Sequence, residues 1–259
     1  MNVRGAVVDL DGTVLRGETL LPGAADAVAA LRERLERVLF LTNNPTVPPD
    51  EYAARLTELG IDAAADDVLT STAATVAYLR ERHDGAATFP IAESSIVDQL
   101  RAADVSLTDD PATAEVVVAG FDREFHYRDL QAALDALGDE TAFVGTDRDR
   151  TIPGEDGPIP GSGAIIRAVA GVTGREPDAV LGKPSATTAR LAADRLGVPS
   201  EDCVLVGDRL DTDVAMGERT GMTTVLVRTG VSGDADLADS DVRPDYVCDS
   251  LADVPDLLG

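Results

Sequence analysis

The feature that most constrains the fold is a short apolar run, residues 6–8, that leads directly into Asp9 and Asp11. Apolar runs of this length predict a strand that is buried on both faces, as in a parallel sheet. Gly12 then ends the strand in a loop. Because open α/β sheets bind ligands at the carboxyl ends of their strands, we expect both carboxylates to lie at a ligand site. The alternative is a solvated acidic turn, since aspartate is abundant throughout the chain.

The two carboxylates at this strand end can divide the work of a reaction. One can attack as a nucleophile while its neighbour gives and takes protons. Together they can also hold a hard cation such as Mg²⁺ through oxygen ligands. The Asp-x-Asp pair therefore predicts a catalytic or metal-binding site.

Lys183 is unusual in this composition. It is the single lysine among 22 basic residues, so the other 21 are arginine. An ammonium group is a compact, strongly hydrated point charge that a guanidinium does not reproduce. Lys183 also precedes a predicted helix that begins near Ser185, a position that suits phosphate binding. Either Lys183 lies beside a phosphoryl group, or it is an exposed surface residue that is lysine only by chance.

Two further apolar runs end in polar residues. Residues 204–206 lead to Asp208 and Asp213, a pair that we expect to hold a divalent cation, because carboxylates gathered at one sheet edge repel one another without one. Residues 38–41 lead to Thr42 and Asn43. Their hydroxyl and the backbone N–H groups at a strand end suit phosphate oxygens.

These four segments, in this order, resemble the haloacid dehalogenase-like (HAD) hydrolase superfamily. The resemblance is carried by its four motifs, which match Asp9-x-Asp11-Gly12-Thr13, Thr42-Asn43, Lys183 and Gly207-Asp208-x-x-x-x-Asp213. More narrowly, the chain resembles subclass IIA, the NagD-like and p-nitrophenylphosphatase-like group, at residues 41–44, 120–122, 182–185 and 207–213. The resemblance covers nearly the whole chain, and it implies a magnesium-dependent phosphatase that passes through an aspartyl-phosphate.

The resemblance implies a catalytic role for three side chains. Asp9 attacks phosphorus, and Asp11 protonates the leaving group before it activates the water that hydrolyses the phospho-enzyme. Lys183 stabilises Asp9 and the phosphoryl charge. Phosphoryl transfer depends mainly on positioning and on charge stabilisation, which agrees with this division. Asp11 disfavours dehalogenation, because a dehalogenase has no alkoxide leaving group to protonate.

The resemblance also implies a phosphate site and a metal site. Thr42 and Asn43 bind the transferring phosphoryl group, with help from the backbone near Gly12. Asp208 holds Mg²⁺ together with Asp9 and the main-chain carbonyl of Asp11. Asp213 orients water on the metal without binding the metal itself.

The spacing of the motifs predicts two domains. Lys183 lies 141 positions after Thr42, far more than one strand–helix unit needs. We expect a doubly wound, Rossmann-like α/β core made of residues 1–83 and 179–259, with mainly parallel strands. The excess, residues 84–178, has alternating strand and helix patterns of its own and is expected to be the α/β cap of the family.

A cap excludes water and contacts the part of the substrate that leaves. Candidates for substrate specificity are Asp122, Arg123, Asp147 and Arg148. The two arginines could meet a second anionic group on the substrate, or they could simply balance acidic neighbours. The family commonly has asparagine where Asp147 stands.

The composition limits the partners. The formal net charge is −25, and the acidic residues are spread along the whole chain. Such a field repels nucleic acid and anionic membranes, so we expect neither as a partner. The spread acidity and the scarcity of lysine resemble cytosolic proteins of halophilic archaea, in which salt screens the repulsion. No signal peptide or membrane span is visible, and we expect a cytoplasmic protein.

The function predicted from the sequence is a Mg²⁺-dependent phosphatase for phosphomonoesters of small metabolites, such as sugar phosphates, phosphoglycolate or nucleotides. Two alternatives stay open. One is a phosphotransferase that passes the phosphoryl group of Asp9 to an acceptor other than water. The other is a catalytically silent phosphate-binding module. Relatives often pair through their caps, so a homodimer through the cap is one option, and the sequence itself leaves the oligomeric state open.

Overall fold

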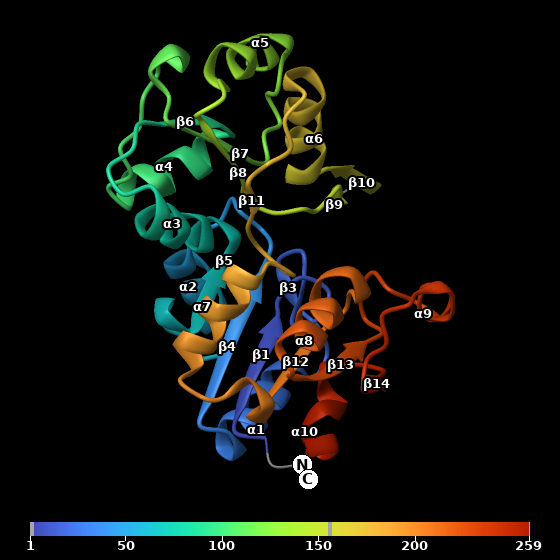
Figure 1. Cartoon of the computed structure of the whole chain (residues 1–259). Helices are drawn as coiled ribbons and strands as arrows, with labels where there is room; N and C mark the ends of the chain where they lie inside the picture. Colours follow the sequence, from blue (N-terminus) through green and yellow to red (C-terminus); the bar gives the residue numbers. More distant parts are fainter. Residues whose placement is uncertain (1–2, 155–156, 259) are drawn as a thin grey trace. The chain divides into compact units, whose positions relative to one another are not determined.

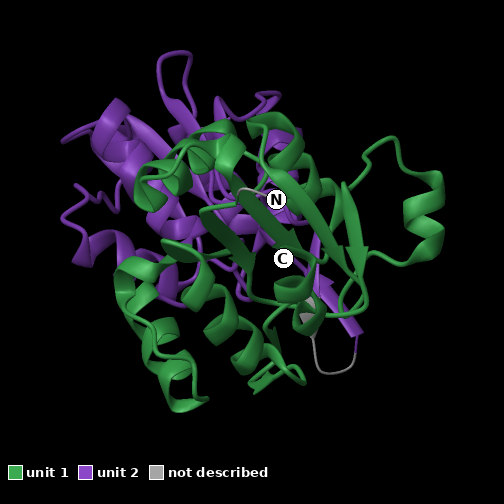
Figure 2. Cartoon of the chain, turned by 90° about the horizontal axis from the view of Figure 1, so that it is seen from below, with its two compact units in different colours: residues 1–42, 49–69, 183–259 green, residues 43–48, 70–182 purple. Residues whose placement is uncertain are grey.

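The computed structural model describes residues 3–154 and 157–258, and the chain divides into two compact units (Figure 2). The first unit takes in residues 1–42, 49–69 and 183–259, and the second takes in residues 43–48 and 70–182.

A parallel six-stranded sheet forms the centre of the first unit (Figure 1). Its strands, in spatial order, are β14 (Tyr246–Cys248), β13 (Thr223–Val227), β12 (Cys203–Gly207), β1 (Gly5–Asp9), β4 (Arg37–Thr42) and β5 (Val68–Thr70). The chain adds β4 and β5 on one side of β1 and adds β12, β13 and β14 on the other. The order of strands therefore reverses between β1 and β12, which is where doubly wound sheets bind their ligands.

The apolar runs in the sequence explain why these two strands are central. Every residue of β1 is buried, and so is every residue of β12. The two strands pair in parallel, with Val7 opposite Leu205 and Val8 opposite Val206. Because both strands run in the same direction, Asp9 and Asp208 emerge at the same edge of the sheet.

Helices of the first unit pack against this sheet. In α1 (Ala24–Arg34) the buried residues Ala27, Val28 and Leu31 recur at the spacing of one helix face. The other helices are α2 (Pro49–Glu58), α7 (Ala186–Leu196), α8 (Ala215–Thr220), α9 (Asp234–Asp239) and α10 (Val254–Leu258), with short helical turns η1 (Ala65–Asp67), η3 (Ser200–Asp202), η4 (Leu210–Val214) and η5 (Leu251–Asp253). A small hairpin, β2 (Leu15–Arg16) and β3 (Thr19–Leu20), follows β1.

The second unit has a parallel sheet of its own, in the order β11 (Ala179–Val180), β8 (Ala142–Gly145), β7 (Val116–Ala119) and β6 (Thr88–Ile91). Its helices are α3 (Ser71–Arg82), α4 (Ser94–Ala102), α5 (Tyr127–Ala136) and α6 (Ser162–Thr173), with a turn η2 (Pro111–Thr113) and an antiparallel pair β9 (Thr151–Gly154) and β10 (Gly157–Pro160). A core that includes Val117, Phe143 and Ile165 joins the sheet to α5 and α6. The predicted α/β class with mainly parallel sheets is confirmed.

The second unit contains the whole of the predicted insert, 84–178, and it is larger than that insert. Hydrogen bonds account for the additional segments. The Gln99 Nε2 in α4 donates to the Pro45 carbonyl at 2.9 Å, and the Ser71 hydroxyl in α3 donates to the Asn43 carbonyl at 2.8 Å. These bonds connect residues 43–48 to α3 and α4, although the domain limits themselves stay a prediction.

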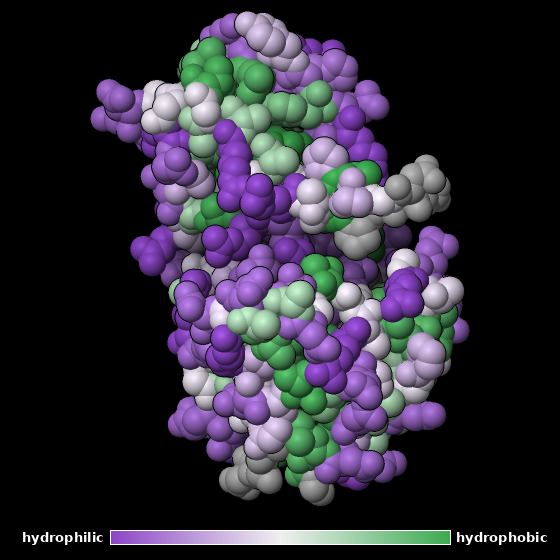
Figure 3. Space-filling model, turned by 90° about the vertical axis from the view of Figure 1, so that its right-hand side faces the viewer, coloured by the Kyte–Doolittle hydropathy of each residue, from purple (hydrophilic) through white to green (hydrophobic). Residues whose placement is uncertain are grey.

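The surface agrees with the acidic composition. On the face drawn in Figure 3, hydrophilic residues lie over most of the surface, with smaller hydrophobic areas between them. None of the helices in the described part of the chain is long and apolar enough to cross a membrane.

Candidate active site

Three buried carboxylates gather at the carboxyl ends of β1 and β12. Asp9 is the last residue of β1, Asp208 directly follows β12, and Asp213 lies in the turn η4. Each offers an oxygen within 4.8 Å of the others. Their exposed fractions are 5%, 1% and 0%, so water does little to screen their mutual repulsion.

Lys183 lies between two of these carboxylates and is itself buried. Its ammonium pairs with Asp9 Oδ1 and with Asp213 Oδ1, the latter at 2.6 Å. Burial alone would lower the pKa of Lys183, but the charges of Asp213 and Asp9 outweigh burial and raise it. The single lysine is therefore a buried cation at the predicted site and not an exposed surface residue.

One ammonium does not neutralise three carboxylates. Burial raises the pKa of Asp9 well above its ordinary range, against the opposing effect of Lys183. Burial, followed by the charge of Asp213, raises the pKa of Asp208 to about 7. A further cation would favour the ionised form of both side chains.

Two carboxylate oxygens show where such a cation would fit. Asp9 Oδ2 and Asp208 Oδ1 are buried and have no hydrogen-bond partner among the residues that the structure describes. Buried polar atoms without partners are uncommon in folded proteins and call for an explanation. Carboxylate oxygens in a group are the donor set that Mg²⁺ prefers, so these residues fit that metal.

Asp11 and Thr42 lie in the same unit and meet each other. The Thr42 hydroxyl, buried at the end of β4, donates to Asp11 Oδ2 at 3.4 Å. The Asp11 side chain is exposed, in contrast to the buried Asp9, so it can reach a solvent-borne group. Gly12 has φ 94°, and a Cβ there would lie 2.6 Å from Asp208 Oδ2, so only glycine permits this approach of the loop to Asp208.

Asn43, the neighbour of Thr42 in the chain, belongs to the second unit. Its amide Nδ2 donates to Asp149 Oδ1 at 3.2 Å. A Cβ at Gly182 would lie 2.6 Å from Asn43 Oδ1, so the backbone at Gly182 packs closely on this amide. Asp149 belongs to the candidate specificity loop 146–149, which follows β8, and its contact with Asn43 could not be predicted from the sequence.

The specificity candidates of the second unit lie in two loops. Arg123 pairs with Glu93 at 3.2 Å and stacks over the Phe121 ring, so it balances an acidic neighbour. Asp122 accepts a backbone hydrogen bond from Glu124 at 2.7 Å, and burial raises its pKa. A role in specificity stays a prediction for both residues.

In the other loop, Arg148 is exposed and Asp147 is buried. Asp147 accepts hydrogen bonds from Ser162 Oγ at 2.5 Å, from Thr146 Oγ1 at 3.1 Å and from the Asp149 N–H at 3.1 Å. Burial, followed by the charge of Asp149, raises the pKa of Asp147 to about 7. Asp147 thus lies in the interior of its own unit.

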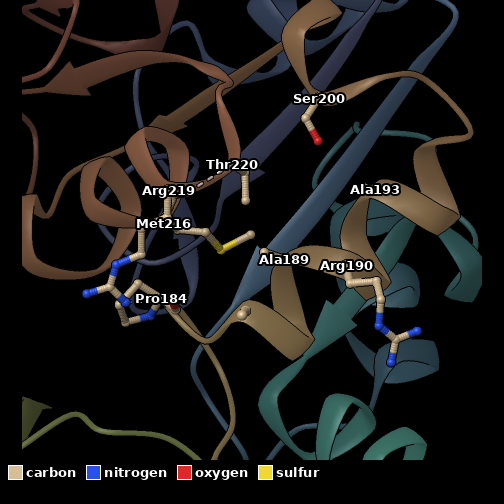
Figure 4. A pocket seen from close by; sticks show the side chains of 9 residues that line it. Pro184, Ala189, Arg190, Ala193, Ser200, Met216, Arg219 and Thr220 are labelled. Carbon is tan, nitrogen blue, oxygen red and sulfur yellow. Dashed lines mark hydrogen bonds between the residues drawn. The ribbon is translucent and has the colours of Figure 1, made fainter.

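A separate pocket of about 230 Å³ lies between α7 and α8 (Figure 4). Its walls include Pro184, Met216 and Ser200. None of the residues predicted to be catalytic, phosphate-binding or metal-binding lines it.

Comparisons with known proteins agree with this geometry. A model of the haloacid dehalogenase-like hydrolases matches residues 6–106, and a HAD-hydrolase-like model matches residues 180–254. The chain is 32% identical to the sugar-phosphatase AraL of Bacillus subtilis over 255 residues, which cover 98% of this chain and 92% of that protein.

Solved structures give the same result. A p-nitrophenyl phosphatase from Archaeoglobus fulgidus is similar with a TM-score of 0.93 at 36% identity, covering 98% of this chain and 99% of that one. NagD from E. coli K-12 is similar with a TM-score of 0.87 at 28% identity, covering 97% and 98%. The chain therefore belongs to the haloacid dehalogenase-like hydrolases, in subclass IIA with NagD and the p-nitrophenyl phosphatases, and it is a phosphoric monoester hydrolase.

Proposed function

We propose that this chain is a Mg²⁺-dependent phosphatase that hydrolyses phosphomonoesters of small metabolites through a covalent phosphate on Asp9. The observation that carries the proposal is the buried group of Asp9, Asp208 and Asp213 around Lys183, in which two carboxylate oxygens lack partners among the described residues. A buried nucleophile beside a fixed cation is what phosphoryl transfer requires.

Asp9 and Asp208 and the main-chain carbonyl of Asp11 would hold Mg²⁺, which when bound supplies positive charge beside the transferring phosphoryl group. Lys183, which pairs with Asp9 Oδ1, supplies a second positive charge beside the phosphoryl group. Asp213 keeps Lys183 in place through its ion pair, and the Arg209 N–H donates to Asp213 Oδ2 at 3.1 Å.

In the first half-reaction a carboxylate oxygen of Asp9 attacks phosphorus, and the bond between phosphorus and the ester oxygen breaks. Asp11 gives its proton to the departing oxygen. The exposure of the Asp11 side chain and its contact with Thr42 support this role, because the group must meet an external leaving oxygen.

In the second half-reaction Asp11, now ionised, takes a proton from water as the water oxygen attacks phosphorus. The bond between phosphorus and Asp9 breaks, and inorganic phosphate leaves. Thr42 and Asn43 bind the phosphoryl oxygens in both steps, with the backbone at Gly12.

Sugar phosphates are the first substrate class to test, because the relative AraL is named a sugar phosphatase and aligns over nearly the whole chain. Phosphoglycolate and nucleotides follow. From the composition and the resemblance we still expect a cytoplasmic enzyme that is adapted to high salt and binds neither nucleic acid nor membrane. A homodimer would form through the cap, residues 84–178.

The test is hydrolysis of p-nitrophenyl phosphate in high KCl, with Mg²⁺ and with EDTA. We expect turnover only with the metal, and release of inorganic phosphate equal to p-nitrophenol when water is the sole acceptor. If adding small alcohols diverts most of the phosphate to the alcohol, the phosphotransferase alternative is correct. A folded protein that binds phosphate analogues without turnover would be the silent module.

A further inference from the structure

The loop of residues 229–232 follows β13, and hydrogen bonds at both of its ends connect it to the site. Its first residue, Thr229, donates from Oγ1 to the Gly12 carbonyl at 2.6 Å. Its last residue, Ser232, donates from its N–H to the Asp208 carbonyl at 3.0 Å and accepts from the Leu210 N–H on Oγ at 3.1 Å. The loop therefore connects the segment after β1, the segment after β12 and the start of η4.

The middle of the same loop contacts the Asp208 carboxylate. The Val231 N–H donates to Asp208 Oδ2 at 2.6 Å. A Cβ at Gly230 would lie 1.8 Å from that oxygen and 2.6 Å from the Asp208 Cβ. Gly230 has no positive φ, so the requirement for glycine there comes from the carboxylate and not from the backbone conformation.

These contacts involve one carboxylate oxygen of Asp208 and leave the other without a hydrogen-bond partner among the described residues. Oδ2 is enclosed by the Val231 N–H, Gly230 and Gly12, whereas Oδ1 is buried without a partner among the described residues. A carboxylate held through one oxygen can turn little about its terminal bond, so the direction of the second oxygen is fixed as well.

We propose that the loop 229–232 is a positioning element for the metal site, in which the Val231 N–H and the space at Gly230 hold Asp208 so that Oδ1 is presented to Mg²⁺. Ser232 is a positioning residue that fixes the loop against Asp208 and against the turn that carries Asp213. The inference rests on the proposed function, because it needs the metal.

Gly230→Ala tests the space beside Asp208. The methyl group must displace the carboxylate or the loop, so we expect the dissociation constant of Mn²⁺, measured by electron paramagnetic resonance on the purified protein, to rise about tenfold or more. The matched control is Gly233→Ala, where a Cβ meets nothing closer than Asp236 Oδ2 at 3.8 Å. The control should bind Mn²⁺ as the parent protein does.

Ser232→Ala provides a second route if Gly230→Ala does not fold. It removes the acceptor of the Leu210 N–H and keeps the backbone donor to Asp208, so we expect a smaller rise in the dissociation constant, about threefold to tenfold. Ser232→Thr keeps the hydroxyl and should restore most of the affinity. With saturating Mg²⁺, kcat of Ser232→Ala should approach that of the parent protein, since only metal binding is weakened.

The outcomes separate this inference from the function. If the parent protein binds Mn²⁺ and turns over substrate but Gly230→Ala and Ser232→Ala bind it equally well, the loop has no positioning role and the function stands. If the parent protein binds no divalent cation, both proposals fail.

Discussion

Two groups of buried aspartates in this chain are built in different ways. Around Asp9 and Asp208, a lysine is buried with the carboxylates and two oxygens still lack partners among the described residues. Around Asp147, both carboxylate oxygens accept hydrogen bonds from Ser162, Thr146 and the Asp149 backbone. The first arrangement leaves places for a ligand, whereas the second satisfies its own polar atoms. Unmet hydrogen-bonding capacity, more than burial or a raised pKa, therefore distinguishes the group that we expect to react.

The largest effect is expected from removing the nucleophile. Asp9→Asn should lower kcat by about a thousandfold or more, because an amide does not attack phosphorus, while the circular dichroism spectrum stays that of the folded protein. The matched change in the other group, Asp147→Asn, should keep kcat within about fivefold. If the two variants have similar activity, the distinction between the groups is wrong.

A smaller effect is expected when the buried cation is changed in shape and not in charge. Lys183→Arg keeps the positive charge but places a broad, planar guanidinium between Asp9 and Asp213, so we expect kcat to fall about a hundredfold. Arg190→Lys, an exchange at an exposed position on α7, is the control and should have little effect. Near-normal turnover in Lys183→Arg would show that arginine can replace Lys183, and the explanation of the single lysine by its role in the site would be wrong.

Mg²⁺ should stabilise the folded protein by binding at the group around Asp9 and Asp208 and not at the group around Asp147. Because a ligand that binds the folded state raises stability with its concentration, adding Mg²⁺ at about a hundred times its dissociation constant should stabilise the parent protein by about 3 kcal/mol. Asp208→Asn should lose most of this rise in melting temperature, whereas Asp147→Asn should retain it. An equal rise in both variants would place the metal elsewhere.

The smallest effect on activity, but a distinct effect on stability, is expected from Asp147→Asn. The folded-state pKa of Asp147 is about 7, above the usual value near 4, so the folded state binds the extra proton and the parent loses stability as pH rises between these values. At about 1.4 kcal/mol per unit, the loss is on the order of 4 kcal/mol. Asparagine stays neutral. Its Oδ1 can accept from the Asp149 N–H, and its Nδ2 can donate to the hydroxyl of Ser162 or Thr146, which reverses the direction of that bond.

Melting temperatures of the parent and Asp147→Asn should therefore be similar near pH 4 and diverge towards pH 8, with the variant more stable. Titrations of groups that do not interact with Asp147 cancel in the difference between the two proteins. A parent protein that is the more stable of the two at pH 8 would show that Asp147 is ionised and needed in that form.

The parts of the site that could be predicted from the sequence are those fixed by strand ends. Asp9 and Asp208 follow apolar runs, and parallel pairing of those runs brings the two carboxylates together. Lys183 could be singled out because it is the one lysine of the chain. The parallel α/β fold followed from the same alternation of strands and helices.

What the sequence could not predict depends on contacts between distant segments. The inclusion of α3 in the second unit depends on bonds such as that from Arg80 to the Ala103 carbonyl. The burial of Asp147 depends on Ser162, fifteen residues away. The contacts of residues 229–232 with Asp208 include backbone hydrogen bonds from Val231 and Ser232, which leave no signature in the residue types.

The most direct test of the account is to identify the phosphorylated residue. Asp11→Asn should slow hydrolysis of the phospho-enzyme more than its formation from p-nitrophenyl phosphate, because p-nitrophenolate leaves without needing a proton. After an acid quench, mass spectrometry should find one phosphoryl group on the peptide that contains Asp9, and none in Asp9→Asn. A burst of p-nitrophenol with no phosphate on that peptide, or phosphate on another residue, would contradict the assignment of Asp9 as the nucleophile.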